Sequence, residues 1–224
     1  GNEITYPSGK KGNLYAWDFY DRTPYKIAVV SEETPIYLFN AIDDTDDLVR
    51  SWRRSFKLVP TDNYGEAEYQ MNLNKLFIPD QEDLNAKPIY DYSFKHFIID
   101  KIKSRQQDLL SKKTLVFKGR SLNNKPCKLQ IAFVLNDGSA FGKVIELGNN
   151  TDDYVIELSD VVLVKTVTLP RPYPSFLPYY LEHEIASPFD IRKIESLQFS
   201  IGPEIPKDEL LDAHGIAIIS VSLK

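Results

Sequence analysis

Hydrophobic and polar residues alternate with a period of two along most of this chain. The stripes are longest over residues 67–74, 90–98 and 129–135. Such alternation is typical of β-strands that turn one face to a core and the other to water. The stripe at 129–135 runs into Asn136-Asp137-Gly138-Ser139, which predicts a hairpin turn. The same pattern predicts further strands at 26–30, 35–40, 144–147, 154–158, 161–168, 197–201 and 219–223.

Helical patterns are few. Acidic residues precede an apolar stretch within 44–52, which favours a short helix there. A second helix is predicted over 100–112, with Ile102, Leu109 and Leu110 facing inwards. About ten strands with one or two short helices predict an all-β fold, a two-sheet jelly-roll β-sandwich.

The length agrees with one such domain. The chain has 224 residues, and all-β sandwiches often use roughly 200–250 residues as a single unit. We expect an N-terminal extension or first strand region at 1–25 and a single jelly-roll domain at 26–224. Proline-rich stretches near 79–88 and 170–178 are interpreted as long loops, because strands resume in register after both.

Composition narrows the function classes. Hydrophobic residues make up 42% and charged residues 26% of the chain, and the net charge is −5. These values exclude disorder and argue against nucleic acid as a partner. No apolar run approaches the roughly 20 residues that a membrane span needs. The single cysteine, Cys127, excludes an internal disulfide and a cysteine-based zinc site, and we expect no cofactor.

One segment is strongly basic. Residues 101–128 contain nine Lys or Arg and one acidic residue, Asp108, for a segment charge of +8. Such a segment could attract an acidic polysaccharide or a charged neighbouring domain. A solvated surface is the more common explanation for a run of like charges.

Familiar catalytic motifs are absent, so we nominate no catalytic residue and favour a protein without enzyme activity. The sequence contains no Gly-x-Ser-x-Gly, no His-Glu-x-x-His and no dinucleotide fingerprint. Glu182, His183 and Glu184 have a spacing usable for metal ligation or acid–base work, but a solvated strand edge is the far more common explanation. The acidic residues at 43–47 could offer oxygen ligands to calcium, but helix capping accounts for them, and we expect no metal site.

Two aromatic clusters suggest a ligand instead, one at residues 15–25 and one at 173–180. Sugar rings pack their C–H faces on Trp and Tyr, while their hydroxyl groups need amide, carboxylate or guanidinium partners. Polar residues of this kind occur in the stripe at 67–74. Closure of the sandwich ends is the alternative role for the aromatics. The candidate carbohydrate-binding residues are Trp17, Tyr20, Gln70, Asn72, Arg171, Tyr173 and Tyr179.

The order of motifs resembles a known family. It runs from Ser51-Trp52-Arg53 through residues 129–142 and 154–160, past Phe176-Leu177-Pro178 and 194–201, to the strand at 215–223. This order is similar to the galactose-binding-like jelly rolls appended to secreted polysaccharide-degrading enzymes of Bacteroidetes-type bacteria. The resemblance implies a non-catalytic module in a secreted, periplasmic or cell-surface protein.

Three functions follow from these observations. The first is a carbohydrate-binding or accessory module of a larger glycan-processing protein, with a polysaccharide or oligosaccharide as its partner. The second is a structural domain that buttresses a glycoside hydrolase catalytic domain of the same full-length chain. The third is a β-sandwich glycoside hydrolase or polysaccharide lyase that uses residues 182–184.

Overall fold

A computed structural model describes the strand backbones at 13–17 and 24–28, and residues 34–50, 56–76, 92–103, 105–174, 179–181 and 188–224. The chain divides into two compact units, Gly1–Pro35 and Ile36–Lys224. In the first unit, β1 (Asn13–Trp17) pairs antiparallel with β2 (Pro24–Ala28). The domain boundary near residue 26 stays a prediction, and β2 lies within the first of these two units.

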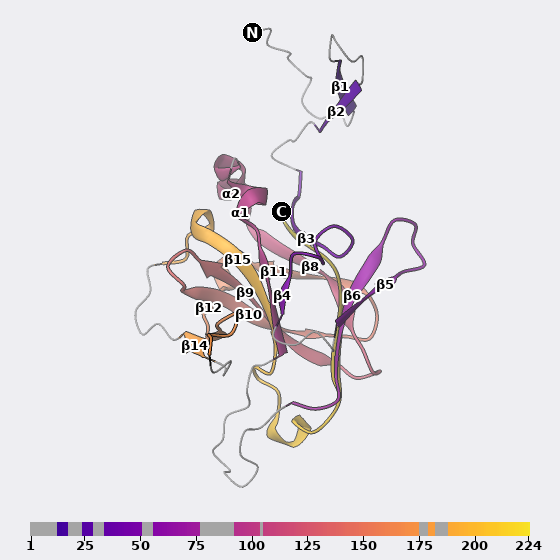
Figure 1. Cartoon of the computed structure of the whole chain (residues 1–224), viewed down its shortest axis with the longest axis vertical. Coiled ribbons are helices and arrows are strands. Elements are labelled where there is room, and N and C mark those ends of the chain that lie inside the picture. The colour runs from indigo at the N-terminus through magenta and orange to yellow at the C-terminus, as the bar shows by residue number, and fades with distance from the viewer. Residues whose placement is uncertain are drawn as a thin grey trace. The chain divides into compact units, whose positions relative to one another are not determined.

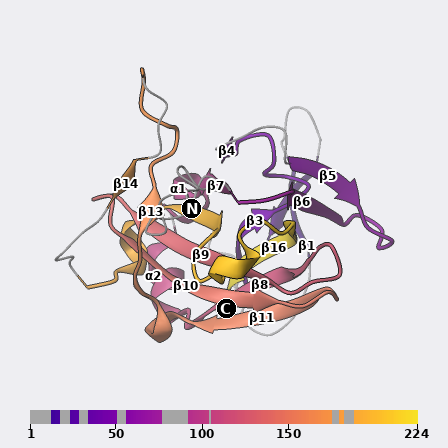
Figure 2. The same ribbon diagram turned by 90° about the horizontal axis from the view of Figure 1, so that it is seen from below.

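The second unit is built from two antiparallel sheets (Figures 1 and 2). We call them the β9 sheet, with strand order β12-β10-β9-β15-β7-β4, and the β16 sheet, with order β11-β8-β16-β6-β5 and β3 also paired to β16. The β9 sheet comprises β4 (Val49–Arg50), β7 (Tyr92–Phe97), β9 (Cys127–Leu135), β10 (Ala140–Leu147), β12 (Val162–Leu163) and β15 (Ile194–Ile201). The β16 sheet comprises β3 (Ile36–Asn40), β5 (Phe56–Pro60), β6 (Ala67–Leu73), β8 (Thr114–Ser121), β11 (Asp152–Glu157) and β16 (His214–Leu223).

The core lies between the two sheets and uses the alternating apolar positions. Phe94 on β7 and Phe199 on β15 are paired in register, and their rings stack with centroids 4.7 Å apart. Phe39 on β3 and Phe117 on β8 reach across from the β16 sheet to Phe199. All four side chains are fully buried. Offset aromatic packing of this kind adds to the stabilisation from area burial, and the predicted β-sandwich is confirmed.

The helix predicted at 44–52 is wrong for the residues that the structure describes. The chain turns through residues 41–47 and then enters β4. The Asp44 carboxylate accepts a hydrogen bond from the Asn40 backbone N–H at 2.7 Å, and the Asp44 N–H donates to the Asn40 carbonyl at 3.0 Å. Because Asp44 bonds to a residue four positions earlier, it closes a turn instead of capping a helix that follows.

The second predicted helix is present as two short helices, α1 (Ile99–Ile102) and α2 (Gln106–Ser111). Ile102 and Leu109 are buried as expected, whereas Leu110 is about half exposed. No described helix is long and apolar enough to cross a membrane. The remaining short elements are β13 (Thr166–Val167), β14 (Tyr180–Leu181) and three 3-10 turns at Leu158–Asp160, Ile191–Lys193 and Lys207–Glu209.

Candidate functional site

The outer faces of the two sheets differ in what covers them. On the β9 sheet, Gln130 donates to the Lys165 carbonyl at 3.0 Å and Gln198 donates to the Val167 carbonyl at 2.8 Å. A second apolar cluster joins Ala132, Val134 and Ala140 to Val164. The segment 164–167 therefore lies over this face, and Figure 2 shows β13 and β14 on the β9 side of the sandwich.

The outer face of the β16 sheet instead carries a cleft of about 600 Å³. The loop between β5 and β6, residues 61–66, forms one wall, and Thr151 from the turn before β11 lines another part. Side chains from β6, β8 and β16 form the floor. We call this the polar cleft; its lining residues are Pro60, Thr61, Asp62, Asn63, Glu66, Glu68, Lys118, Arg120, Thr151 and Ile219.

The β5–β6 loop is held in shape by its own polar groups. The Thr61 N–H donates to the Glu66 carbonyl at 3.1 Å, and the Glu66 N–H donates to the Asn63 carbonyl at 3.2 Å. Gly65 adopts φ +74°, a left-handed conformation that glycine takes without strain. This turn leaves Tyr64 fully exposed in the loop.

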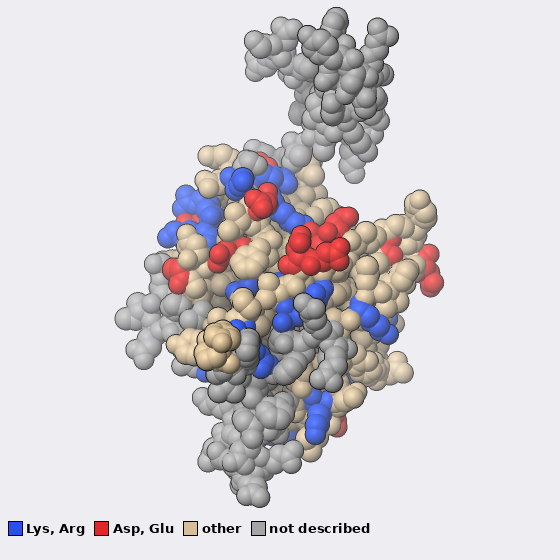
Figure 3. Space-filling view, in the orientation of Figure 1, with Lys and Arg blue, Asp and Glu red and all other residues tan. Residues whose placement is uncertain are grey.

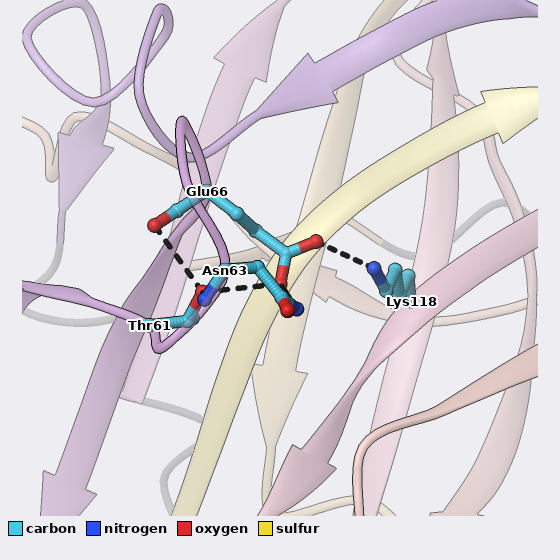
Figure 4. Close-up of polar contacts among 4 residues, drawn as sticks. All are labelled: Thr61, Asn63, Glu66 and Lys118. Atoms are coloured by element: carbon cyan, nitrogen blue, oxygen red, sulfur yellow. Dashed lines mark hydrogen bonds and ion pairs between the residues drawn. The ribbon is translucent and has the colours of Figure 1, made fainter.

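Glu66 connects the β5–β6 loop to β8, on the other side of β16. Its carboxylate accepts from the Asn63 side-chain amide at 2.9 Å and from the Thr61 hydroxyl at 3.2 Å. Its other oxygen lies 2.5 Å from Lys118 Nζ on β8. Figure 4 shows this contact passing over β16, the yellow strand that separates the two residues. The contact therefore ties the loop wall to the floor of the polar cleft.

A second ion pair crosses β16 next to the first. Arg120 on β8 donates through Nε and Nη2 to the two carboxylate oxygens of Glu68 on β6, at 3.0 and 2.7 Å. Gln70 donates its side-chain amide to the same carboxylate. On β16, Ala217 is paired in register with both Gln70 and Arg120. Its small side chain leaves room for the long side chains to meet above the strand.

Both glutamates are held in the ionised form. The hydrogen bond from Lys118 is the main cause that lowers the pKa of Glu66, with a further contribution from Asn63. Burial opposes ionisation of Glu68, but the hydrogen bonds from Arg120 and Gln70 outweigh it, so the pKa of Glu68 is lowered as well. The pKa of Arg120 is raised by its bond to Glu68. At neutral pH the cleft thus offers fixed acceptors and donors.

The basic segment 101–128 is largely neutralised in the folded chain. Seven of its nine cations lie within 4.0 Å of a carboxylate: Lys101, Lys103, Arg105, Lys118, Arg120, Lys125 and Lys128. Lys125, for example, lies 2.7 Å from both Glu209 and Asp212. Figure 3 shows basic and acidic side chains intermingled on the face in view. The folded segment is therefore not a free basic surface.

The structure distributes the predicted binding residues over separate places. Gln70 and Asn72 lie on β6, on the outward side of the β16 sheet; Gln70 is buried beside Glu68, and Asn72 accepts a 3.1 Å bond from Asn123. Neither residue lines the polar cleft, although Gln70 contacts Glu68, which does. Their role in binding stays a prediction.

The other candidates lie elsewhere. Arg171, Tyr173 and Tyr179 belong to the β13–β14 connection near the β9 sheet, where Tyr173 and Tyr179 are 84% and 60% exposed. Trp17 ends β1 in the first unit, and Tyr20 lies outside the described residues. The candidates whose side chains the structure describes therefore lie in two places, on β6 and on the β13–β14 connection.

The sequence analysis did not identify several residues of the polar cleft. Glu68 was recognised only as a polar member of a stripe, and Asn63, Glu66, Lys118 and Arg120 were not predicted to share a site. The signal for the loop was Asn63-Tyr64-Gly65, a turn sequence between two strands. No sequence signal shows that residues 66 and 118 lie opposite each other.

The remaining candidate chemistry gives no further site in the described part of the chain. Glu182, His183 and Glu184 lie outside it. Asp44 is buried, and its carboxylate lies 2.5 Å from Lys101 Nζ. The ammonium group thus contacts the oxygen that a calcium ion would need as a ligand. Among the described residues, no group of three or more His, Cys, Asp or Glu side chains is arranged to hold a metal ion.

Comparisons with known proteins bear on the fold. No protein-family model matches the chain, and no curated protein matches it in sequence. A family 11 carbohydrate-binding module from Clostridium thermocellum, solved with a β-1,3-1,4-mixed-linked tetrasaccharide, matches with a TM-score of 0.53 at 10% identity, over 84% of this chain and 95% of that one. The chain thus shares the β-sandwich fold of that module.

Two agarase structures also match, more distantly. An agarase has a TM-score of 0.40 at 12% identity, and an exo-β-agarase has 0.44 at 10% identity. Each match covers 85% of this chain but only about a quarter of the enzyme, 24% and 25% respectively.

Proposed function

We propose that the chain is a non-catalytic carbohydrate-binding module and that the polar cleft is its glycan-binding site. The observation that carries this proposal is the cleft of about 600 Å³ on the outer face of the β16 sheet. Ligand pockets in proteins have roughly this size, about 300–1,000 Å³. The shared fold with a module solved in complex with a tetrasaccharide supports the same reading.

The chemistry of the cleft suits sugar hydroxyl groups. A hydroxyl both donates and accepts, so it needs acceptors and donors side by side. Glu66 and Glu68 supply acceptors, while Lys118, Arg120 and Asn63 supply donors. Tyr64, in the same loop as the lining residues Asn63 and Glu66, is an exposed aromatic residue of the kind on which sugars stack.

The electrostatics of the cleft favour binding over catalysis. A glycoside hydrolase needs one carboxyl group that stays protonated at working pH because its pKa is raised. The pKa values of Glu66 and Glu68 are both lowered. These two carboxylates therefore suit hydrogen bonding to a ligand and not proton donation to a leaving group.

The wider setting rests on the resemblance in motif order. Galactose-binding-like jelly rolls of secreted polysaccharide-degrading enzymes favour a secreted, periplasmic or cell-surface location for this module. They also favour attachment to a catalytic domain of the same full-length chain. In that setting the module would keep the enzyme close to its polysaccharide.

Affinity gel electrophoresis against a panel of soluble polysaccharides tests the proposal. We expect at least one polysaccharide to retard the protein, and Lys118→Met to reduce the retardation. The matched control, Tyr173→Ala on the β13–β14 connection, should leave it unchanged. Retardation that Tyr173→Ala abolishes and Lys118→Met does not would move the site to the aromatic surface. No retardation by any member of the panel would favour a structural domain that buttresses a catalytic domain.

A further inference from the structure

We infer that the polar cleft selects uncharged glycans and excludes acidic ones, because each cation on its floor is already paired with a carboxylate. This inference rests on the proposed function and specifies its ligand class. It sets aside the reading in which the basic segment 101–128 attracts an acidic polysaccharide, since Lys118 and Arg120 belong to that segment.

The pairing accounts for both cations that line the cleft. Lys118 Nζ lies 2.5 Å from Glu66 Oε2. Arg120 makes a two-point contact with Glu68, at 2.7 and 3.0 Å. With Asp62 added, the lining has three acidic residues and two basic ones, a formal charge of −1. A sulfated or carboxylated polysaccharide therefore meets no net positive field in the cleft.

An acidic ligand would also meet a fixed like charge. A ligand carboxylate at the remaining N–H groups of Arg120 would lie close to the ionised carboxylate of Glu68, whose side chain is only 6% exposed, and like charges repel strongly where burial reduces screening. If the ligand instead took the guanidinium away from Glu68, it would leave a buried carboxylate without its ion-pair partner, which is strongly destabilising. Glu66 and Glu68 thus disfavour acidic glycans, and repulsion of an unwanted ligand is a common source of specificity.

A neutral glycan can use the same groups without breaking a pair. Each carboxylate oxygen has two lone pairs, and a guanidinium has five N–H groups, of which Glu68 takes two in the contact described above. Ligand hydroxyl groups can bond to the remaining positions. Because no counter-charge is exchanged, the binding of such a glycan should depend little on salt.

The sharpest test is to unpair Lys118 without adding a new charge. Glu66→Gln keeps the size and the acceptor oxygen but removes the charge that neutralises Lys118. The matched control is Glu146→Gln on β10, which changes the net charge equally at an exposed position of the other sheet. Mixed-linkage β-glucan and laminarin serve as neutral probes, alginate and polygalacturonate as acidic ones. Retardation is measured in affinity gels at low and moderate salt, after circular dichroism confirms folding.

We expect a neutral probe to retard the wild type equally at both salt concentrations, and acidic probes to leave it unretarded. Glu66→Gln should gain salt-sensitive retardation by an acidic probe, by about fivefold or more in affinity, while Glu146→Gln should not. Strong binding of acidic probes by the wild type, reduced by Lys118→Met, would overturn the inference and leave the proposed function standing. An equal gain in both glutamine variants would also overturn it. If no probe retarded the wild type or any variant, both the inference and the proposed function would be overturned.

Discussion

Arg120 on β8 and Glu68 on β6 form a two-point ion pair across the strand that separates them, with N–O distances of 2.7 and 3.0 Å. Neighbouring strands are about 4.8 Å apart, so these two backbones are roughly 10 Å apart and only long side chains can meet. On the strand between them, Ala217 is in register with Arg120 and with Gln70, the neighbour of Glu68 on the same face of β6, and its small side chain keeps the space open. The floor of the polar cleft is thereby fixed before any ligand arrives.

The Arg120–Glu68 pair should give stability a defined acid limit. Because the pKa of Glu68 is lowered in the folded chain, its contribution is complete above its ordinary value of 4.5 and is lost as pH falls through the folded pKa. Arg120→Met, which leaves the buried carboxylate without a cation and with the Gln70 amide as its remaining described hydrogen-bond donor, should lower the free energy of unfolding by about 1–3 kcal/mol at pH 7.

Urea unfolding between pH 7 and pH 3 measures both effects. The double variant Arg120→Met/Glu68→Gln serves as the control, because it removes the charge together with its partner. It should recover part of the lost stability and lose less on acidification than the wild type. An Arg120→Met variant as stable as the wild type at pH 7 would contradict the role given to this pair.

His96 should make the protein less stable at mildly acidic pH. The residue is 3% exposed, and its ring packs against the Phe39 ring with 5.8 Å between centroids. Asp44 Oδ1 lies 3.7 Å from its Nε2. Burial is the main cause that lowers its pKa; Asp44 opposes this shift, and Lys101 adds to it. The unfolded chain therefore takes up a proton below pH 6.5 while the folded chain resists it, and stability falls with pH.

This decline should reach at most about 1.4 kcal/mol per pH unit, in a window above the one that Glu68 controls. Urea midpoints at pH 7, 6 and 5 test it, with His96→Gln as the comparison. The variant should show a smaller decline than the wild type over this range. If the wild type gained stability on going from pH 7 to 5, the ion pair with Asp44 would dominate, and the claim that burial lowers the pKa of His96 would be wrong.

Cys127 should be inert in the folded protein. The thiol is buried, and burial raises its pKa to about 12, an effect that the nearby Lys125 only partly opposes. Since the thiolate is the reactive form, alkylation by iodoacetamide at pH 8 should be roughly a thousandfold slower than for an exposed thiol. Mass spectrometry with and without urea measures this. Rapid labelling of the native protein would contradict the buried placement.

Tyr64 should affect glycan affinity without affecting stability. The side chain is fully exposed in the β5–β6 loop, so Tyr64→Ala removes little packing. A stacking contact contributes about 0.5–1.5 kcal/mol, which corresponds to roughly a two- to tenfold weaker affinity. Isothermal titration with the polysaccharide that retards the wild type measures it, with Tyr179→Ala as the matched exposed control. Equal losses in both variants would contradict a site at the polar cleft.

Much of the fold was predictable because it follows from local periodicity. The stripe at 129–135 became β9, and the turn at 136–139 leads into β10 as expected. The helix predicted at 44–52 failed because the Asp44 side chain bonds to Asn40, an alternative that composition alone does not reveal. Side-chain hydrogen bonds of this kind compete with helix capping.

The polar cleft was only partly predictable, because it depends on register between distant strands. Glu68 stood in the polar stripe at 67–74, and Gln70, which contacts it, was nominated from the same stripe. Glu66 and Lys118, however, are 52 residues apart and meet only because β6 and β8 flank β16. The basic segment 101–128 suggested an acidic partner for the same reason. Most of the carboxylates that neutralise it come from other parts of the chain and could not be paired with it from the sequence.

The most direct test of the central claim is an NMR titration of the ¹⁵N-labelled protein with the oligosaccharide form of whichever polysaccharide retards it. We predict that shift changes will cluster at the amides of 61–70, 118–121, 151 and 217–220, the backbone around the polar cleft. Changes confined to 166–181, around Arg171, Tyr173 and Tyr179, would contradict this account and place the ligand on the β13–β14 connection.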